Sequence, residues 1–243
     1  ARAMSPKRGA NPMKPINVGF WVSAGTSVLG FLIVSYVYMR GIVLKNGVEV
    51  EWWRFFLATF SGIVLASFIQ KLTEYFTSTE HKPVTEIAYA SKTGPATMII
   101  QGFAIGLESS VWSVVAIVCA LLAPLFIFPP TLFGGGERNA VLSFYGIALT
   151  GLGLLTTTGY ILAMDTFGPI SDNANGIFEM SGALTHDETG RGTRIVARLD
   201  QIGNTTKALT KGYAVASAGL AAFLLFSAYL DRVKHLKGIP PET

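Results

Sequence analysis

Residues 93–130 read TGPATMIIQGFAIGLESSVWSVVAIVCALLAPLFIFPP, an apolar run with Glu108 inside it. A helix needs about 20 apolar residues to cross a bilayer, so this run is long enough to span one, and its excess must tilt or protrude. Half of the 243 residues are hydrophobic and only 14% are charged, whereas soluble domains carry about a quarter charged residues. The composition therefore argues against a soluble protein.

Four further apolar runs complete a set of five expected spans, and the fold class that they predict is all-α, a polytopic transmembrane helix bundle. The spans are placed at about 17–39, 53–77, 93–128, 141–171 and 204–230, with a cytoplasmic leading segment at 1–16, a cytoplasmic connection at 172–203 and a tail at 232–243. Glycine, serine and alanine are dense in the last two spans. Small residues let helix backbones approach closely in lipid, so these spans are expected to pack tightly.

The net charge of +4 does not indicate nucleic-acid binding, because Lys and Arg cluster between apolar runs without interleaved aromatic residues. Under the positive-inside rule, three basic segments are cytoplasmic. They hold Arg2, Lys7, Arg8 and Lys14, then Lys71, Lys82 and Lys92, then Arg191, Arg194, Arg198, Lys207 and Lys211. The opposite loop before the fourth span has only Arg138, whereas Arg40, Lys45, Arg54, Arg232, Lys234 and Lys237 oppose this orientation.

Carboxylates recur every seven residues around the end of the fourth span, at Asp165, Asp172 and Glu179. Seven residues make nearly two helical turns, so the three share one face in steps of about 10 Å. Oxygen ligands in such an arrangement suit hard divalent cations such as Mg²⁺. The alternatives are a solvated helix face for Glu179 and a structural hydrogen bond for Asp165.

A second polar group opens the fifth span, where Asn204, Lys207 and Lys211 are expected on one helical face. If the helix begins at Asn204, this residue is an N-cap, and that helix end favours anions. The alternative is an ordinary cap with lysines that reach toward the membrane interface. Taken together, the acidic and basic faces predict a Mg²⁺–phosphate site at the mouth of the bundle.

Other ionisable residues lie at or near membrane depth, where such groups mark function by default. Glu108 is interpreted either as a buried member of an ion path or as a residue without that role. Glu74 and Lys71 are close enough in sequence to form a local ion pair. The single cysteine, Cys119, is interpreted as a small buried hydrophobic residue.

The two polar segments resemble signature segments of membrane-integral pyrophosphatases. These are Asp-Thr-Phe-Gly-Pro-Ile-Ser-Asp-Asn-Ala from Asp165 and Gly-Asn-Thr-Thr-Lys-Ala from Gly203. Further matches follow in the family's order over nearly the whole chain. They are Asn11-Pro12-Met13-Lys14, Thr73-Glu74-Tyr75-Phe76-Thr77-Ser78, Thr93-Gly94-Pro95-Ala96-Thr97, Phe144-Tyr145-Gly146 and Lys211-Gly212-Tyr213-Ala214. An unrelated channel or transporter does not account for this order.

The resemblance implies hydrolysis of Mg²⁺-bound pyrophosphate coupled to pumping of H⁺ or Na⁺ by a homodimeric assembly. By position, Asp172 and Asn204 resemble the family's Mg²⁺–pyrophosphate ligands. From its place on the basic helical face, Lys211 is a further candidate for this binding, and Asp165, Glu179 and Glu108 are secondary candidates. Lys207 and Thr210 resemble the K⁺-independent subclass, in which the ammonium replaces an activating potassium ion. That subclass is associated with proton pumping, and the family fits a vacuolar, acidocalcisomal or bacterial plasma membrane.

Three positions depart from the family's usual pattern: Asn175, Phe178 and Ala197. The connection between Glu179 and Asp200 is also longer than usual. The family's remaining acidic motifs and its ion gate have no counterpart in these five spans, so this chain alone is not expected to hydrolyse pyrophosphate. Three hypotheses follow: a fragment, one part of a split pump, or a catalytically degenerate subunit that acts as a membrane scaffold.

Overall fold

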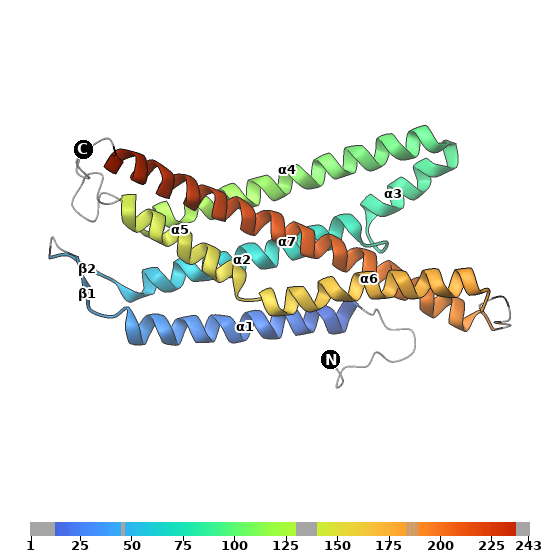
Figure 1. Cartoon of the computed structure of the whole chain (residues 1–243), viewed down its shortest axis with the longest axis horizontal. Coiled ribbons are helices and arrows are strands. Elements are labelled where there is room, and N and C mark those ends of the chain that lie inside the picture. The colour runs from blue at the N-terminus through green and yellow to red at the C-terminus, as the bar shows by residue number, and fades with distance from the viewer. Residues whose placement is uncertain are drawn as a thin grey trace. The chain divides into compact units, whose positions relative to one another are not determined.

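The computed structural model describes residues 13–44, 47–129, 140–183, 185, 187 and 189–236. Most of the expected leading segment, the end of the tail, and the residues Arg2, Lys7, Arg8, Lys45, Arg138 and Lys237 lie outside this part of the chain. Figure 1 shows the order of the elements along the chain. They are α1 (Met13–Tyr38), β1 (Ile42–Val43), β2 (Glu49–Val50), α2 (Trp52–Thr77), α3 (Lys82–Ala90), η2 (Ser91–Thr93), α4 (Pro95–Ile127), α5 (Ala140–Leu155), α6 (Thr158–Ser181) and α7 (Arg191–Leu236).

The helices confirm the expected all-α polytopic bundle. Four of them, α1, α2, α4 and α7, are long and apolar enough to cross a membrane, and the pair α5–α6 brings the number to five if it forms one span. The result follows from the bilayer, which offers backbone groups no hydrogen-bonding partner, so that an apolar run satisfies them internally as a helix. One small departure is an antiparallel pair of two-residue strands, β1 and β2.

The expected fourth span is broken rather than continuous. Its two halves, α5 and α6, meet at an angle of 47°. Threonines occupy positions 156 to 158 at this break, and their branched side chains restrict the helical rotamers. Thr156 also bends the chain locally, because its hydroxyl donates to the Gly153 carbonyl at 2.8 Å while its backbone N–H reaches the same oxygen at 3.4 Å. A side chain that competes for a helical carbonyl in this way favours a bend.

The helix that contains the expected fifth span, α7, begins at Arg191 rather than at Asn204. The residues before it supply the stabilisation that Asn204 was expected to give. The Asp187 carboxylate accepts the backbone N–H of Thr193 at 3.0 Å and the hydroxyl of Thr189 at 2.9 Å. The hydrogen bond from the Thr193 backbone is the main cause that lowers the pKa of Asp187 from 3.8 to about 2. Asp187 thus stabilises the first turn of α7, and Asn204 lies within the helix.

Replacing Asp187 by alanine is expected to speed amide exchange in the first turn of α7 by about fivefold, the effect of losing a typical cap. Because the folded-state pKa is depressed, the contribution of this carboxylate is fully present above pH 3.8 and is lost as the pH falls toward 2. Hydrogen exchange read by mass spectrometry on a peptide covering residues 191–196 measures the change. Equal exchange in the variant and the parent protein would contradict this role.

Contacts divide the chain into two compact units. Unit 2 comprises Val22–Phe68, Val114–Thr157 and α7 from Ala214 onward. Its α2 and α5 approach each other through glycines: a Cβ on Gly62 would lie 1.9 Å from the Thr150 carbonyl oxygen, and a Cβ on Gly153 1.9 Å from that of Thr59. Between them, the hydroxyls of Ser61 and Thr150 are 3.0 Å apart. Hydrogen-bonding small residues therefore hold these two helices at close range.

The strand pair closes one end of unit 2. Gly47 adopts a φ of +82°, which glycine reaches without strain, and Leu44 N–H donates to Val48 O at 2.9 Å beside it. Next to the strands, the apolar residues Val50, Phe55, Ala58, Phe128 and Leu149 form a buried cluster. The guanidinium of Arg54 donates to the Ile127 carbonyl at the end of α4, where a cation is favoured by the helix dipole, and to Glu51 at 2.7 Å. The hydrogen bond from Arg54 lowers the pKa of Glu51.

Unit 1 comprises α1 up to Trp21 together with Ile69–Ser113 and Thr158–Tyr213. In this unit α1 contacts α6, because Gly19 leaves room for the Tyr160 ring and the Tyr160 hydroxyl donates to the Ile16 carbonyl at 2.5 Å. The α2 helix contacts α7, since a Cβ on Gly212 would lie 2.9 Å from the Thr73 hydroxyl. Within this unit, α6 therefore contacts α1, and α7 contacts α2.

A chain of amide and carboxylate groups links α1 to α2 in unit 1. The Gln70 amide donates to the side-chain oxygen of Asn17 at 3.1 Å, and the Asn17 amide donates to Glu74 at 3.0 Å. Among the ion pairs of the described residues, the local pair expected between Lys71 and Glu74 does not occur. The expectation considered only the short separation of Lys71 and Glu74 in the sequence. In the structure, the Glu74 carboxylate instead accepts a hydrogen bond from Asn17 on the neighbouring helix α1.

Candidate functional site

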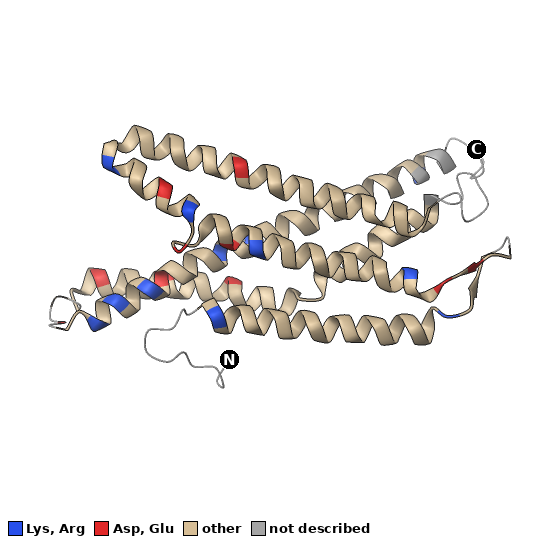
Figure 2. Ribbon diagram, turned by 180° about the vertical axis from the view of Figure 1, so that it is seen from behind, with Lys and Arg blue, Asp and Glu red and all other residues tan. Residues whose placement is uncertain are grey.

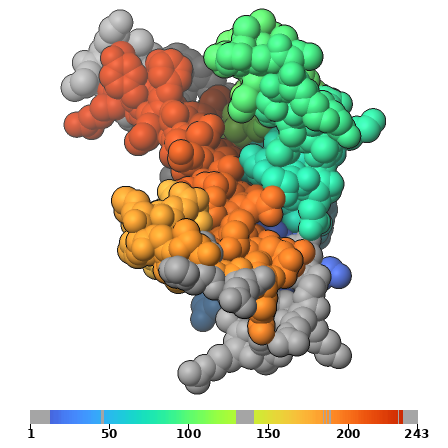
Figure 3. All heavy atoms as spheres, turned by 90° about the vertical axis from the view of Figure 1, so that its right-hand side faces the viewer, coloured from blue at the N-terminus to red at the C-terminus, as the bar shows by residue number. Residues whose placement is uncertain are grey.

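Charged residues gather on the end of α6 and the first part of α7 (Figure 2). Figure 3 shows this side of unit 1, with the orange atoms of α6 and α7 in contact next to the teal atoms of the end of α2 and α3. Two glycines explain the contact. A Cβ on Gly203 would lie 2.0 Å from the Ser171 Oγ, and a Cβ on Gly168 would lie 2.5 Å from a side-chain carbon of Lys207. The side chains of Ser171 and Lys207 therefore lie directly against the backbone of the neighbouring helix.

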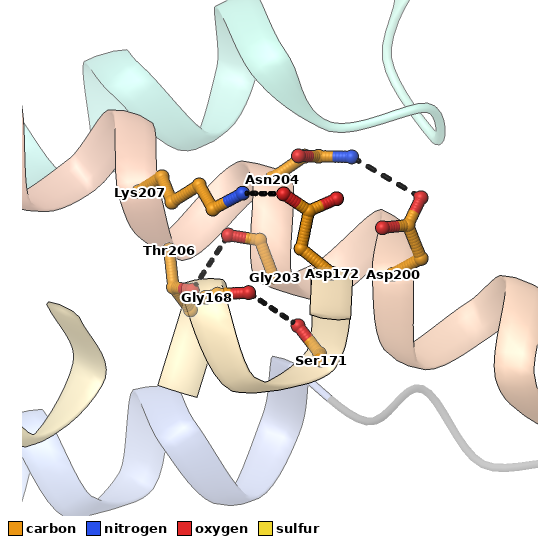
Figure 4. A network of polar contacts seen from close by, with 8 residues as sticks. All are labelled: Gly168, Ser171, Asp172, Asp200, Gly203, Asn204, Thr206 and Lys207. Carbon is orange, nitrogen blue, oxygen red and sulfur yellow. Dashed lines mark hydrogen bonds and ion pairs between the residues drawn. The ribbon is translucent and has the colours of Figure 1, made fainter. Parts of the chain in front are cut away.

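The central contact is an ion pair between the two helices. The Lys207 Nζ on α7 lies 2.7 Å from the Asp172 Oδ2 on α6, and the two side chains remain 27% and 55% exposed (Figure 4). An exposed pair of this kind contributes little to stability, because water screens both charges. Its consequence is positional, because it fixes a carboxylate and an ammonium at one place.

One turn further along α7 and nearly two turns back along α6, Thr210 and Asp165 form a second contact between the two helices. The Thr210 hydroxyl lies 2.7 Å from the Asp165 Oδ1 and 2.9 Å from the Lys207 carbonyl oxygen. Thr210 is only 7% exposed. A hydroxyl has one proton, so the carboxylate and the carbonyl share it. The contact orders the turn of α7 that carries Lys207.

Asn204 lies one turn before Lys207 on α7 and is paired within its own helix. Its amide Nδ2 donates to the Asp200 Oδ2 at 3.3 Å (Figure 4). The other oxygen of Asp200, Oδ1, is buried and has no hydrogen-bond partner in the part of the chain that the structure describes. The charges of Asp172, Glu179 and Lys207 all act on this carboxylate. Asp200 therefore belongs to the same cluster as Asp172.

The structure thus brings together five residues that the sequence predicted for the site: Asp165, Asp172, Asn204, Lys207 and Thr210. We call these five residues and Asp200 the α6–α7 site. Glu179 lies further along α6, as the seven-residue spacing predicted, and accepts a hydrogen bond from Asn175 at 3.2 Å. Lys211 is exposed on the next turn of α7. Glu108 is exposed on α4, and no hydrogen bond or ion pair joins it to the α6–α7 site within the described residues.

Asp200 was not among the residues that the sequence singled out. The signal that would have found it is the spacing of Asp200, Asn204 and Lys207, which are four and then three residues apart and share a face of any helix that contains all three. That signal was hidden because the helix was expected to begin at Asn204. Once α7 starts at Arg191, the three positions follow one another along a single helical face.

The donors present can hold a divalent cation in part. Among the described residues, no group of three or more His, Cys, Asp or Glu side chains is arranged as a complete metal site. However, Mg²⁺ is commonly bound through one or two carboxylates with substrate phosphates and water. The carboxylates of Asp172 and Asp200 and the amide oxygen of Asn204 are such donors, and the unpartnered Asp200 oxygen calls for a cation or a water. These donors could supply part of the coordination shell of a divalent cation.

Taken together, the apolar helices and the polar contacts define a polytopic helical membrane protein with a charged cluster on α6 and α7. A family model described as inorganic H⁺ pyrophosphatase matches residues 1–240. The chain belongs to this family.

Curated relatives agree with this assignment. A "K(+)-insensitive pyrophosphate-energized proton pump" of Chloroflexus aurantiacus is 44% identical over 95% of this chain and 28% of its own length. A protein of Moorella thermoacetica named "K(+)-insensitive pyrophosphate-energized proton pump 2" is 48% identical over 94% of this chain and 31% of its own. A "putative K(+)-stimulated pyrophosphate-energized sodium pump" of Clostridium tetani is 38% identical. The chain spans less than a third of the length of these relatives.

Proposed function

We propose that this chain forms part of a proton-translocating membrane pyrophosphatase, which hydrolyses Mg²⁺-bound pyrophosphate to phosphate and moves H⁺ across the membrane. The observation that carries the proposal is the ion pair between Asp172 and Lys207, which joins the two signature segments at a single site. Family membership and the names of the relatives support it. The chain supplies one part of the site, and the remaining pyrophosphatase helices supply the rest.

In this proposal, each residue of the site has a defined task. Asp172 and Asn204 offer oxygen atoms to Mg²⁺, and the exposed Lys211 offers an ammonium to a phosphate group. The ammonium of Lys207 occupies the place of an activating potassium ion, while Thr210 and Asp165 order the helix turn behind it. If Asp172 and Asn204 held Mg²⁺ there, the ion would supply charge neutralisation of the phosphate and polarisation of its oxygens for attack by water. Glu179 and Glu108 remain secondary candidates.

The same proposal places the end of α6, the start of α7 and the residues between them in the cytoplasm, where pyrophosphate is available. The basic residues Arg191, Arg194 and Arg198 favour that side under the positive-inside rule. The protein is multi-pass in its membrane, which in this family is a vacuolar, acidocalcisomal or bacterial plasma membrane, and the complete unit is a homodimer. Protons are preferred over sodium as the transported ion because Lys207 and Thr210 match the K⁺-independent type.

Pyrophosphate-dependent acidification of vesicles containing the complete protein tests this function. We expect acidification and phosphate release without added K⁺, because Lys207 supplies the cation. We expect Asp172→Ala to reduce both by at least 100-fold, since it removes a metal ligand and leaves Lys207 without its partner. Asp187→Ala is the matched control, because it removes a carboxylate of the same connection that does not contact the site, and it should retain activity within about twofold.

Retention of full activity in Asp172→Ala would remove this residue from the site. A strict requirement for K⁺ would overturn the assignment of Lys207. Absence of pyrophosphate hydrolysis in the complete, folded protein would favour the scaffold hypothesis.

A further inference from the structure

We infer that Arg40 and Tyr36 form a binding site for the phosphate group of an anionic phospholipid, at the membrane surface where α1 ends. The inference does not depend on the α6–α7 site or its activity, because the residues that carry it belong to unit 2. Three observations support it: exposed aromatic rings that mark the membrane surface, contacts that hold the Arg40 guanidinium beside them, and hydrogen-bond donors suited to a phosphate.

Aromatic residues gather where α1 ends and α2 begins. Tyr36, Tyr38 and Trp53 are exposed there, and the Tyr36 ring meets the Trp52 ring edge to face, with 5.3 Å between their centroids. Tyrosine and tryptophan are enriched at the surfaces of a bilayer, where part of the side chain is in contact with lipid and part with water. With 26 residues, α1 is about 39 Å long, enough to cross a bilayer. These rings therefore mark the level of the phospholipid headgroups at the end of α1.

Arg40 follows the last turn of α1, and its side chain turns back toward these rings. Its Nη1 donates to the Tyr36 hydroxyl at 3.0 Å, and its guanidinium carbon lies 5.4 Å from the centre of the Tyr36 ring. An arginine at the end of a membrane helix otherwise extends its charged group into water. The hydrogen bond to a residue four positions earlier instead keeps the guanidinium at the level of the headgroups.

The charge of Arg40 is not neutralised by the described residues. Tyr36 is its hydrogen-bond partner there, and no ion pair among these residues involves Arg40. The Glu51 carboxylate is paired with Arg54, which is buried. Both arginines oppose the orientation that the positive-inside rule favours, but contacts inside the protein account only for Arg54. An anion from outside the chain is the partner that Arg40 calls for.

The donors at this place suit a phosphate group. A guanidinium carries five N–H donors in a planar fork that can bind two phosphate oxygens side by side. Tyr36 accepts one of these N–H groups, so the proton of its own hydroxyl can be donated to a phosphate oxygen. An anionic phospholipid is the occupant that fits best, because its headgroup carries no ammonium that would be repelled by Arg40.

Native mass spectrometry of the complete, delipidated protein in neutral detergent, titrated with phosphatidylglycerol, tests this inference. A neutral micelle has no surface potential, so direct contacts retain the lipid. We expect Arg40→Ala to raise the half-saturating lipid concentration by about tenfold or more, because it removes charge-assisted hydrogen bonds. Arg40→Lys should lie between Arg40→Ala and the parent, since lysine keeps the charge but lacks the planar fork. Tyr36→Phe should also weaken binding, because it removes the hydroxyl that orients the guanidinium.

Lys82→Ala is the matched control. It removes an exposed positive charge at the start of α3, which belongs to unit 1 and lies outside the Arg40 cluster. This variant should titrate like the parent. An equal loss of lipid binding in Lys82→Ala and Arg40→Ala would show a general attraction of the lipid to a basic protein and would overturn the inference.

Two further measurements identify the occupant. Inorganic phosphate should not displace the lipid, because it has no acyl chains to hold it beside the aromatic rings; displacement would assign the site to a soluble anion instead. Without lipid, Arg40→Ala should unfold at the same temperature as the parent, because the Arg40 side chain is exposed. A lower midpoint would show that Arg40 is paired within the complete protein, which would overturn the assignment to a lipid.

Discussion

Substitution of Gly153 by alanine is expected to destabilise the protein by about 2 kcal/mol or more. The added Cβ would lie 1.9 Å from the carbonyl oxygen of Thr59 and 2.8 Å from its carbonyl carbon. These are backbone atoms of α2, which cannot rotate away as a side chain can. Overpacking of a tight interior typically costs about 1–3 kcal/mol and occasionally more. Alanine gains up to about 1 kcal/mol over glycine in a helix, which is too little to offset the clash.

Gly151, two residues earlier on α5, is the matched control. A Cβ at this position meets no atom within 4 Å in the described structure, so Gly151→Ala keeps only the gain in helix propensity. Thermal unfolding of the purified protein should place the midpoint of Gly153→Ala clearly below the parent and that of Gly151→Ala at or above it. Equal midpoints for the two variants would show that α2 and α5 are not held at the distance described here.

The sequence was sufficient to predict the membrane helices. Each long apolar run favours the bilayer, where no water is present, so its backbone N–H and C=O groups must form hydrogen bonds within a helix. It was insufficient wherever a helix continues outside such a run. The first turns of α7 are polar and give no hydropathy signal, so their helical state depends on local contacts such as the one between Asp187 and Thr193. The start of α7 was placed too late for this reason, and Asp200 was missed with it.

The α5–α6 break escaped prediction for a related physical cause. Apolar length indicates how far a segment can reach, but it does not indicate whether the segment is straight. The break depends on the Thr156 hydroxyl, which donates to the Gly153 carbonyl, and on a close approach of Gly153 to α2 that only the folded structure reveals. Similarly, the partner of Glu74 is Asn17, more than 50 residues away in sequence. Contacts of this kind depend on tertiary structure rather than on spacing.

The site itself was predictable in one respect. A spacing of seven residues placed Asp165 and Asp172 on one face of a helix, and both face α7, where they contact Thr210 and Lys207. What the spacing could not supply was the distance between the helices. That distance depends on Gly168 and Gly203, whose role appears only when both backbones are in view.

Gly203→Ala is expected to reduce pyrophosphate-dependent activity of the complete protein by about 10- to 100-fold. Its Cβ would lie 2.0 Å from the Ser171 Oγ, so α6 and α7 must separate or the Ser171 side chain must move. Separation would lengthen the 2.7 Å contact between Lys207 and Asp172, and a displacement of about 1 Å within a catalytic site is enough for a loss of that size.

The Ser171→Ala/Gly203→Ala double variant tests this cause directly. Removing the Ser171 hydroxyl eliminates the 2.0 Å contact and leaves distances of 3.2 Å to the Gly168 carbonyl oxygen and 3.3 Å to the Ser171 Cβ, which small shifts relieve. The double variant should therefore recover most of the activity that Gly203→Ala loses, whereas Ser171→Ala alone should stay close to the parent. If activity falls in Gly203→Ala and the second substitution does not restore it, the loss does not arise from the spacing of α6 and α7. Restoration would show that the glycine at position 203 maintains the distance at which the Asp172 carboxylate and the Lys207 ammonium meet.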